Sequence, residues 1–109
     1  MLVVNETDEN VQIYKINSTN AYEMVYSSNS AVRDAAMGNG FVYYIVSGAN
    51  MLYKISTANY ALVGTYAFGS NKQPTKLMIV NNTLVVYVYL SSTGNSGNLV
   101  LLRDDLTLL

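Results

Sequence analysis

The chain has 109 residues, half of them hydrophobic, and it contains neither cysteine nor histidine. Only 12% of the residues are charged, and six basic against seven acidic side chains give a net charge of -1. This balance argues against nucleic-acid binding, which needs clustered Lys and Arg. The apolar stretches are too short to cross a membrane as helices. Without His or Cys, the Ser-His-Asp and Cys-His catalytic sets and the usual zinc sites are excluded within this chain. We therefore expect a protein that is not an enzyme and holds no cofactor.

The N-terminal part predicts short strands separated by a polar loop. Residues 2–4 and 13–16 are rich in Val, Ile and Tyr, which favour a half-buried pleated surface. Between them, Glu6, Asp8 and Glu9 form an acidic cluster. Their spacing does not match the alternating acidic pattern of a calcium loop, so we expect a solvated loop.

The middle of the chain carries the clearest pattern. It predicts four short strands bounded by Gly, Asn and Ser, at residues 32–37, 41–47, 51–56 and 60–68. Asn39-Gly40 indicates a hairpin, because both residues tolerate a positive φ. A helical turn over residues 31–37 is the alternative for the first segment. Four short antiparallel strands in roughly 40 residues correspond to one blade of a β-propeller.

The rest of the chain repeats this pattern. An offset of 39 residues places Ile13-Tyr14-Lys15-Ile16 on Leu52-Tyr53-Lys54-Ile55, and an offset of 43 places Phe41-Val42-Tyr43-Tyr44 on Leu84-Val85-Val86-Tyr87. The sequence therefore predicts one all-β segment over residues 1–109. Its copies are expected at about residues 2–30, 31–71 and 72–109.

Two segments resemble a known family. Residues 51–65 (MLYKISTANYALVGT) and 99–109 (LVLLRDDLTLL) are similar to the third strand, turn and fourth strand of YVTN-type, NHL-type and PQQ-like propeller repeats. The family's Asp before the turn is replaced here by Ser56 and, in the first copy, by Asn17, so these residues would have to supply the turn bonds. The resemblance implies propeller-type blades. Such propellers are often secreted or cell-surface binding modules, and some are enzymes.

The expected blades do not complete a ring. The first copy begins at its second strand and the third ends inside its fourth, whereas propellers close with four to eight blades. We expect either a longer chain or several copies of this chain to supply the remaining blades. A β-sandwich or a fibre of stacked sheets is the alternative fold.

Two cations and two tyrosines are the candidate ligand-binding residues. Arg33 and Lys76 fall on equivalent positions at the start of the innermost strands, which line the channel of a propeller, where they could bind an anion. Each could instead pair with an acid such as Asp34 or simply be exposed. Tyr44 and Tyr87 belong to a larger set of tyrosines that could stack on sugars. Tyrosine is also common in the half-buried faces of strands, where it packs against neighbouring side chains. The other tyrosines of this set are Tyr43, Tyr53, Tyr60, Tyr66 and Tyr89.

The remaining candidates concern modification and metal binding. Asn5, Asn17 and Asn81 each begin an N-x-[ST] sequon, beside predicted turns. They are glycosylation candidates if the protein is exported, and low charge with many Tyr, Asn and Thr residues suits an extracellular or cell-surface location. Asp104-Asp105 could contribute to a Ca²⁺ site, but a solvated turn is the simpler interpretation.

Three functions follow from the sequence. The first is a non-enzymatic binding or scaffold module of a larger surface or secreted protein, with a protein or glycan partner. The second is a structural subunit of a filament or virion, whose open edges neighbouring chains complete. The third is a fragment of a propeller enzyme whose catalytic residues lie elsewhere.

Overall fold

The computed structural model describes residues 2–6, 10–28, 30–46, 48–90 and 97–109, and every regular element within them is a β-strand. The strands are β1 (Leu2–Glu6), β2 (Val11–Ile16), β3 (Tyr22–Ser27), β4 (Val32–Gly38), β5 (Phe41–Val46), β6 (Met51–Ser56), β7 (Leu62–Ala67), β8 (Lys72–Val80), β9 (Thr83–Leu90) and β10 (Gly97–Leu102). The predicted all-β fold is therefore confirmed. Asp8, Glu9 and Ser47, which belong to predicted loop and strand segments, lie outside the described residues.

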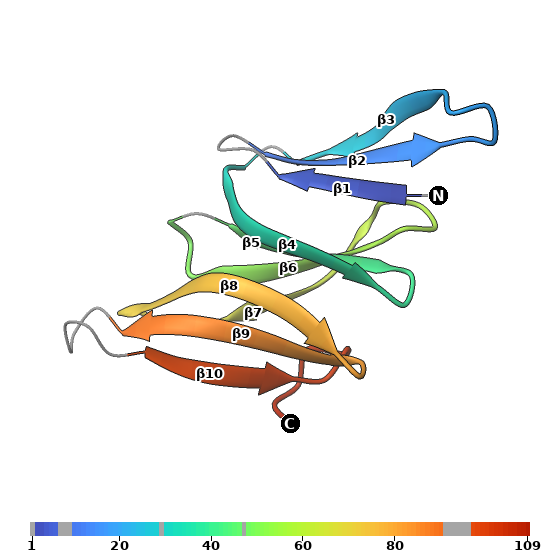
Figure 1. Ribbon diagram of the computed structural model, residues 1–109. Helices are drawn as coiled ribbons and strands as arrows, with labels where there is room; N and C mark the ends of the chain where they lie inside the picture. The colour runs from blue at the N-terminus through green and yellow to red at the C-terminus, as the bar shows by residue number, and fades with distance from the viewer. Residues whose placement is uncertain (1, 7–9, 29, 47, 91–96) are drawn as a thin grey trace.

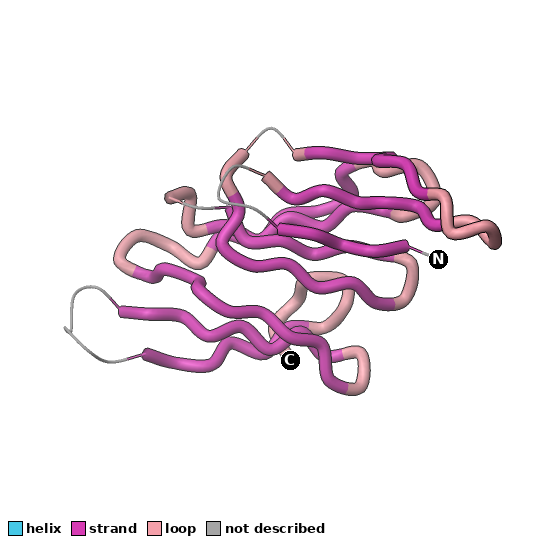
Figure 2. The backbone as a smooth tube through the Cα atoms, turned by 45° about the horizontal axis from the view of Figure 1, so that its top comes forward, coloured by secondary structure: helices cyan, strands magenta, loops and turns pink. Residues whose placement is uncertain are grey.

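The strands form three antiparallel sheets that stack in chain order (Figure 1). Sheet A has the order β1-β2-β3, sheet B the order β4-β5-β6-β7, and sheet C the order β10-β9-β8. Within each sheet, strands that are consecutive in the chain lie side by side (Figure 2). The stack measures 50 × 28 × 20 Å. Sheets A and C end it, so the stack is open and not a closed ring.

Two tight hairpins fix the inner strands of sheets B and C. Asn39 and Gly40 connect β4 to β5 with φ values of 53° and 82°, and Asn81 and Asn82 connect β8 to β9 with 50° and 64°. Two central residues with positive φ define the type I′ turn, whose twist matches that of the flanking strands. The predicted Asn39-Gly40 hairpin is confirmed. Because β4 pairs with β5 along its length, the helical alternative for residues 31–37 is wrong.

The turns before the fourth strands use the side chains that replace the family's Asp. Asn17 Oδ1 accepts a hydrogen bond from Thr19 N at 2.9 Å, and Ser56 Oγ accepts one from Ala58 N at 3.1 Å. The predicted turn bonding is confirmed. The fourth strand of sheet B begins at Leu62 instead of residue 60, because Tyr60 adopts a φ of 57° to close the turn.

Two separate hydrophobic cores hold the three sheets together. The core between sheets B and C is built around buried residues of β5, β6 and β9, with contributions from the C-terminal segment: Tyr43, Ile45, Leu52, Phe68, Leu77, Leu84, Val86, Val88, Leu102 and Leu106. The core between sheets A and B contains Val11, Ile13, Val32, Val42, Tyr44, Val46 and Ile55. Strand β5 thus contributes alternate residues to the two cores, which explains why it has no polar face.

The structure corrects the alignment of the second and third copies by one residue. The two hairpin turns superpose with an offset of 42, which places Val42 on Leu84. Both of these side chains face the preceding sheet. The predicted offset of 43 places Tyr43 on Val86, yet these two residues point to opposite faces of their sheets. In a strand, a slip of one residue exchanges the faces, so 42 is the structural repeat.

The same correction separates Arg33 from Lys76. The pairing of β4 with β5 shifts between Val32 and Asp34, which makes Arg33 the extra residue of a β-bulge. The pairing of β8 with β9 shifts between Pro74 and Lys76. Lys76 is therefore the counterpart of Asp34, and the prediction that Arg33 and Lys76 are equivalent is wrong.

Candidate functional site on the third sheet

The outer face of sheet C is apolar, and none of the described residues outside this sheet covers it. Leu77, Ile79, Leu84, Val86 and Leu102 point to sheet B, so the alternate residues of β8, β9 and β10 point away from it. We call these residues the sheet C face: Lys76, Met78, Val80, Val85, Tyr87, Leu99 and Leu101. Met78 is 55% exposed and Leu99 is 64% exposed. Apolar side chains gathered in this way indicate an interaction surface.

A depression lies at the inner side of this face. Its volume is about 310 Å³, and its walls come from four strands. The lining residues are Asp34, Lys76, Leu77, Met78, Val85, Tyr87 and Leu99. The structure therefore brings two of the predicted ligand-binding residues, Lys76 and Tyr87, into one site. It adds the apolar side chains of Met78, Val85 and Leu99, which the sequence did not single out.

Gly97 sets the position of the Tyr87 ring. Tyr87 pairs with Leu99 across the β9–β10 ladder, and its side chain lies over the backbone of Gly97. A Cβ atom built at residue 97 would stand 2.3 Å from the Tyr87 hydroxyl oxygen, so a side chain there would force the Tyr87 ring to move. The absence of a side chain at residue 97 thus allows the ring to lie across the strand and form one wall of the depression.

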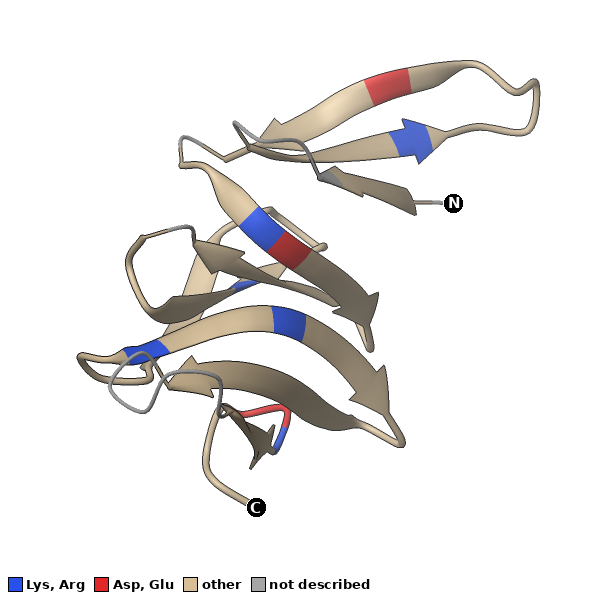
Figure 3. Ribbon diagram, turned by 60° about the vertical axis from the view of Figure 1, so that its left-hand side comes forward, with Lys and Arg blue, Asp and Glu red and all other residues tan. Residues whose placement is uncertain are grey.

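Asp34 joins the inner strands of sheets B and C beside this depression. Its Oδ2 accepts a hydrogen bond from Leu77 N at 2.7 Å, and its Oδ1 accepts one from Ala35 N at 3.0 Å. The carboxylate thereby satisfies a backbone donor of the neighbouring sheet. Strand β4 carries a basic and an acidic residue side by side, and β8 carries basic residues only (Figure 3). Arg33 and Lys76 are exposed. Anion binding by these two cations stays a prediction.

Tyr44 lies away from the sheet C face. It is buried between sheets A and B, and its hydroxyl is 3.3 Å from that of Tyr26. Burial, followed by the hydrogen bond with Tyr26, raises the pKa of Tyr44. The one-residue slip in the predicted repeat explains its selection, because the true counterpart of Tyr87 is Ile45. The Tyr44 side chain is therefore a packing element of the core.

Most of the other tyrosines also pack within the fold. Tyr53 lies 5.5 Å from Tyr44 between ring centroids, Tyr60 stacks on Tyr26 at 6.3 Å, and Tyr66 meets Phe68 edge-on at 4.9 Å. Tyr43 is buried in the core between sheets B and C. The structure thus favours the packing interpretation for this part of the set.

The three sequon asparagines are exposed. Asn5 lies within β1 and donates a hydrogen bond from Nδ2 to Gln12 Oε1 at 3.3 Å. Asn17 and Asn81 lie in turns. The hydroxyl residue of the first sequon, Thr7, falls outside the described residues. Glycosylation stays a prediction for all three.

The Asp104-Asp105 pair lies in the turn after β10. Asp105 Oδ1 accepts hydrogen bonds from Thr107 N at 3.1 Å and Thr107 Oγ1 at 2.6 Å, and these bonds lower the pKa of Asp105. The carbonyl oxygen of Asp104 accepts hydrogen bonds from the Tyr43 hydroxyl and from Lys54 Nζ. The pair thus forms a self-bonded turn that reaches sheet B. No group of three or more metal-ligating side chains occurs in the described part of the chain.

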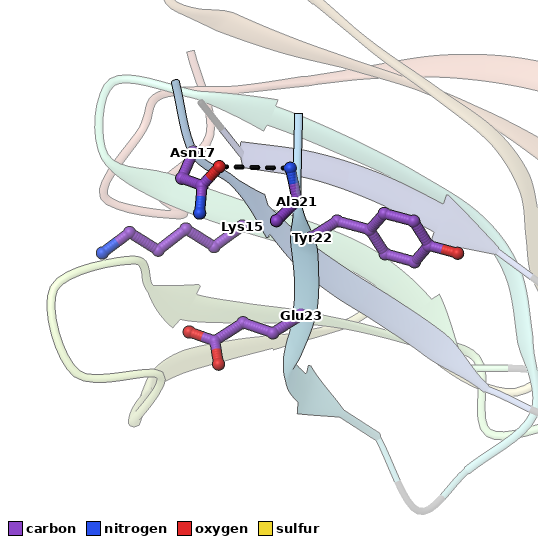
Figure 4. A pocket seen from close by; sticks show the side chains of 5 residues that line it. All are labelled: Lys15, Asn17, Ala21, Tyr22 and Glu23. Carbon is purple, nitrogen blue, oxygen red and sulfur yellow. Dashed lines mark hydrogen bonds between the residues drawn. The ribbon is translucent and has the colours of Figure 1, made fainter. Parts of the chain in front are cut away.

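A second depression, of about 360 Å³, lies at the end of the β2–β3 hairpin. It is lined by Lys15, Asn17, Ala21, Tyr22 and Glu23, and Asn17 Oδ1 accepts a bond from Ala21 N within it (Figure 4). The Tyr22 ring points away from the Lys15 and Glu23 side chains (Figure 4). Because these groups diverge, they do not form one ligand site.

The chemistry of the sheet C depression favours contact with another macromolecule. Its lining combines one carboxylate, one ammonium group and one phenol with the aliphatic or thioether side chains of Met78, Val85 and Leu99. The carboxylate is already bonded to backbone amides. An apolar surface with a few polar groups at its edge is the pattern of a protein interface.

Comparison with known proteins supports the propeller-type fold. No family model matches the sequence, and no curated protein matches it. Among solved structures, the computationally designed Ika8 protein matches with a TM-score of 0.71 and 15% identity, over 95% of this chain and 30% of that one. A europium-containing methanol dehydrogenase matches with a TM-score of 0.70 and 12% identity, over 97% of this chain and 21% of that one. The computationally designed Ika4 protein matches with a TM-score of 0.52 and 12% identity.

These structures are propeller proteins, so the three sheets are propeller-type blades. The match to Ika4 covers 88% of this chain and 62% of that one. The chain thus spans less than two thirds of each of the three structures. The described residues contain no helix that is long and apolar enough to span a membrane.

Proposed function

We propose that this chain is a non-enzymatic scaffold module, a run of propeller-type blades that holds a protein partner on the sheet C face. One observation carries the proposal. In sheet B, Tyr43 and Ile45 are buried beneath sheet C, whereas their repeat counterparts, Val85 and Tyr87, lie on the open face. The open face of sheet C thus repeats the positions that sheet B buries against its neighbour. It is therefore suited to pack against a further sheet.

The composition of this face supports a protein partner over a small charged ligand. Lys76 is its one charged residue, and Tyr and Met contribute to it, two types that are enriched at protein interfaces. Exposed Leu99 and Met78 are suited to become buried anchors in such a contact. We further propose that the chain belongs with the YVTN, NHL and PQQ-like repeats and acts outside the cell or at its surface, where the three sequons would carry glycans.

Site-specific photo-crosslinking in the native source tests the scaffold function. A photoreactive residue replaces Leu99, and the matched control replaces Val63, which is 52% exposed on β7 at the rim of sheet B. We expect residue 99 to attach covalently to a polypeptide segment and residue 63 to give a much weaker product. Absence of any polypeptide crosslink at residue 99, or equal crosslinking at both positions, would overturn the proposal.

The structural-subunit function is the second candidate, because both ends of the stack are uncovered (Figure 1). A filament or virion subunit would use both ends, whereas a scaffold holding one partner needs only the sheet C face. Mapping which polypeptide is attached at residue 99 separates the two. The enzyme-fragment function would require catalytic residues outside this sequence.

A further inference from the structure

The opposite end of the stack carries a second uncovered face, of different composition. In sheet A, Leu2, Val4, Val11 and Ile13 pack toward sheet B, so the alternate positions face away from it. We call these residues the sheet A face: Val3, Tyr14, Ile16, Tyr22 and Met24. Tyr22 is 73% exposed and meets Tyr14 edge-on, with ring centroids 5.9 Å apart. A depression of about 220 Å³ lies between Val3, Tyr14, Ile16 and Tyr22.

Inside the chain, two kinds of sheet face pack against each other, and the two uncovered faces are one of each kind. At each internal junction, the face of one sheet that points toward the C-terminal end of the stack meets the face of the next sheet that points toward the N-terminal end. The sheet C face is of the first kind and the sheet A face is of the second. Placing a second copy head to tail therefore continues the established series of interfaces, while joining two like faces does not.

We propose that the sheet C face of one copy of this chain binds the sheet A face of a second copy, head to tail. The inference rests on the proposed scaffold function and names the partner of the same face. Because the two surfaces differ, the contact is heterologous, and successive copies continue into a closed ring or an open stack. The exposed Tyr22 ring and Leu99 side chain become buried in the contact.

Light scattering of the purified 109-residue chain over a range of concentrations tests this proposal. Leu99→Lys places a charge on the sheet C face, and Met24→Lys places one on the sheet A face, where the side chain is 53% exposed. We expect the unchanged chain to form oligomers. Each variant should self-associate at least about tenfold more weakly, because the charge must be buried on contact. Val63→Lys is the matched control and should assemble like the unchanged chain.

Mixing the two variants gives the decisive result. Each retains one intact face, and the two intact faces are complementary, so an equimolar mixture should form a dimer with one copy of each. Far-UV circular dichroism verifies that the variants fold, and Met78→Lys and Tyr22→Lys serve as second variants of the two faces. A monomeric unchanged chain, self-association of either variant through like faces, or a mixture that stays monomeric would overturn the proposal.

The crosslinking result separates this inference from the proposed function. A crosslink from residue 99 to residues 2–24 of another copy supports both. A crosslink to a different polypeptide, or to another segment of the same chain, leaves the scaffold function standing and overturns the head-to-tail contact. No crosslink to any polypeptide overturns both.

Discussion

The two junctions of the stack are held in different ways. Between sheets B and C, the apolar core is flanked by polar bonds on both sides: Asp34 to Leu77 N on the inner strands, and the Asp104 carbonyl to Tyr43 and Lys54 further out. Between sheets A and B, the described contacts around the core are aromatic, with Tyr26 stacked on Tyr60 and hydroxyl-bonded to Tyr44. Among the described contacts, the second junction combines packing with one hydroxyl pair.

The difference follows from the strands that each sheet contains. Sheet C has an inner strand, β8, so a carboxylate on β4 finds a backbone donor across the gap. In sheet A the strand in contact with β4 is β1, which corresponds to the second strand of a blade. Blades of one repeat can therefore share a core pattern and differ in the hydrogen bonds that link them. These hydrogen bonds depend on which strands the neighbouring sheet contains.

The largest effect is expected in the core between sheets B and C. Leu84 is 1% exposed, and Leu84→Ala should lower the free energy of unfolding by about 2–5 kcal/mol through lost burial and the cavity that remains. Urea denaturation measures the change. Ile13→Ala makes the matched test in the core between sheets A and B. A loss below about 1 kcal/mol for Leu84→Ala would contradict the assigned core.

The polar link on the inner strands gives the next largest effect. Asp34→Ala leaves Leu77 N without its acceptor, and we expect a loss of about 1–3 kcal/mol. Asp34→Asn keeps one carbonyl oxygen and should lose less. Hydrogen exchange at the Leu77 amide measures the local effect and should accelerate in Asp34→Ala. Unchanged exchange at this amide would show that Asp34 does not join the two sheets.

The hydroxyl pair between sheets A and B gives a smaller effect with a distinct pH dependence. Tyr44→Phe should cost about 0.5–1.5 kcal/mol near neutral pH, because the bond with Tyr26 is lost. Burial and this bond raise the pKa of Tyr44 above its ordinary value of 10.0. The folded state thus keeps the proton that the unfolded chain releases, so the contribution of Tyr44 is complete below pH 10 and declines as the pH rises further.

Unfolding in urea at neutral pH and at about pH 11 measures this dependence. The difference between the unchanged chain and Tyr44→Phe should shrink at the higher pH. A constant difference at both pH values would contradict the raised pKa of the buried hydroxyl.

The smallest effect concerns the turn that offers the Asp104 carbonyl to sheet B. Thr107→Val removes the hydroxyl bond to Asp105, so the pKa of Asp105 should rise toward its ordinary value of 3.8. With its pKa lowered in the folded state, Asp105 contributes stability above pH 3.8 that is lost as the pH falls through the folded value. An NMR titration of the carboxyl group measures the shift. If Asp105 titrates identically in the unchanged chain and in Thr107→Val, the Thr107 hydroxyl does not cause the lowered pKa.

The sequence predicts the strands well where turn chemistry marks their ends. Asn39-Gly40 predicts a two-residue turn, and Asn17 and Ser56 indicate the turns before the fourth strands. The register of the repeat was harder to predict from the sequence. Residues 42–46 of β5 are all buried, because β5 serves two cores, so the usual alternation of polar and apolar residues is absent. Without it, offsets of 42 and 43 match the hydrophobic pattern equally well.

The candidate site could be predicted only in part, for the same reason. Lys76 and Tyr87 were recognisable as a cation and an aromatic residue on strands, but Tyr44 entered the site through the one-residue slip. Met78, Val85 and Leu99 were indistinguishable from core residues in the sequence. Their membership depends on which face of sheet C is covered, and this is decided by packing between sheets that lie far apart in the chain.

The inner edges of the three sheets differ in how they resist unwanted pairing. On β8, buried Pro74 has no amide hydrogen to donate, and the neighbouring bulge at Thr75 interrupts the ladder. On β4, the bulge at Arg33 places a charged residue at the edge. Both devices discourage aggregation by strand addition. The regular β1 edge has neither a proline nor a bulge along Leu2–Glu6. Of these three inner edges, β1 is therefore the least protected against strand addition.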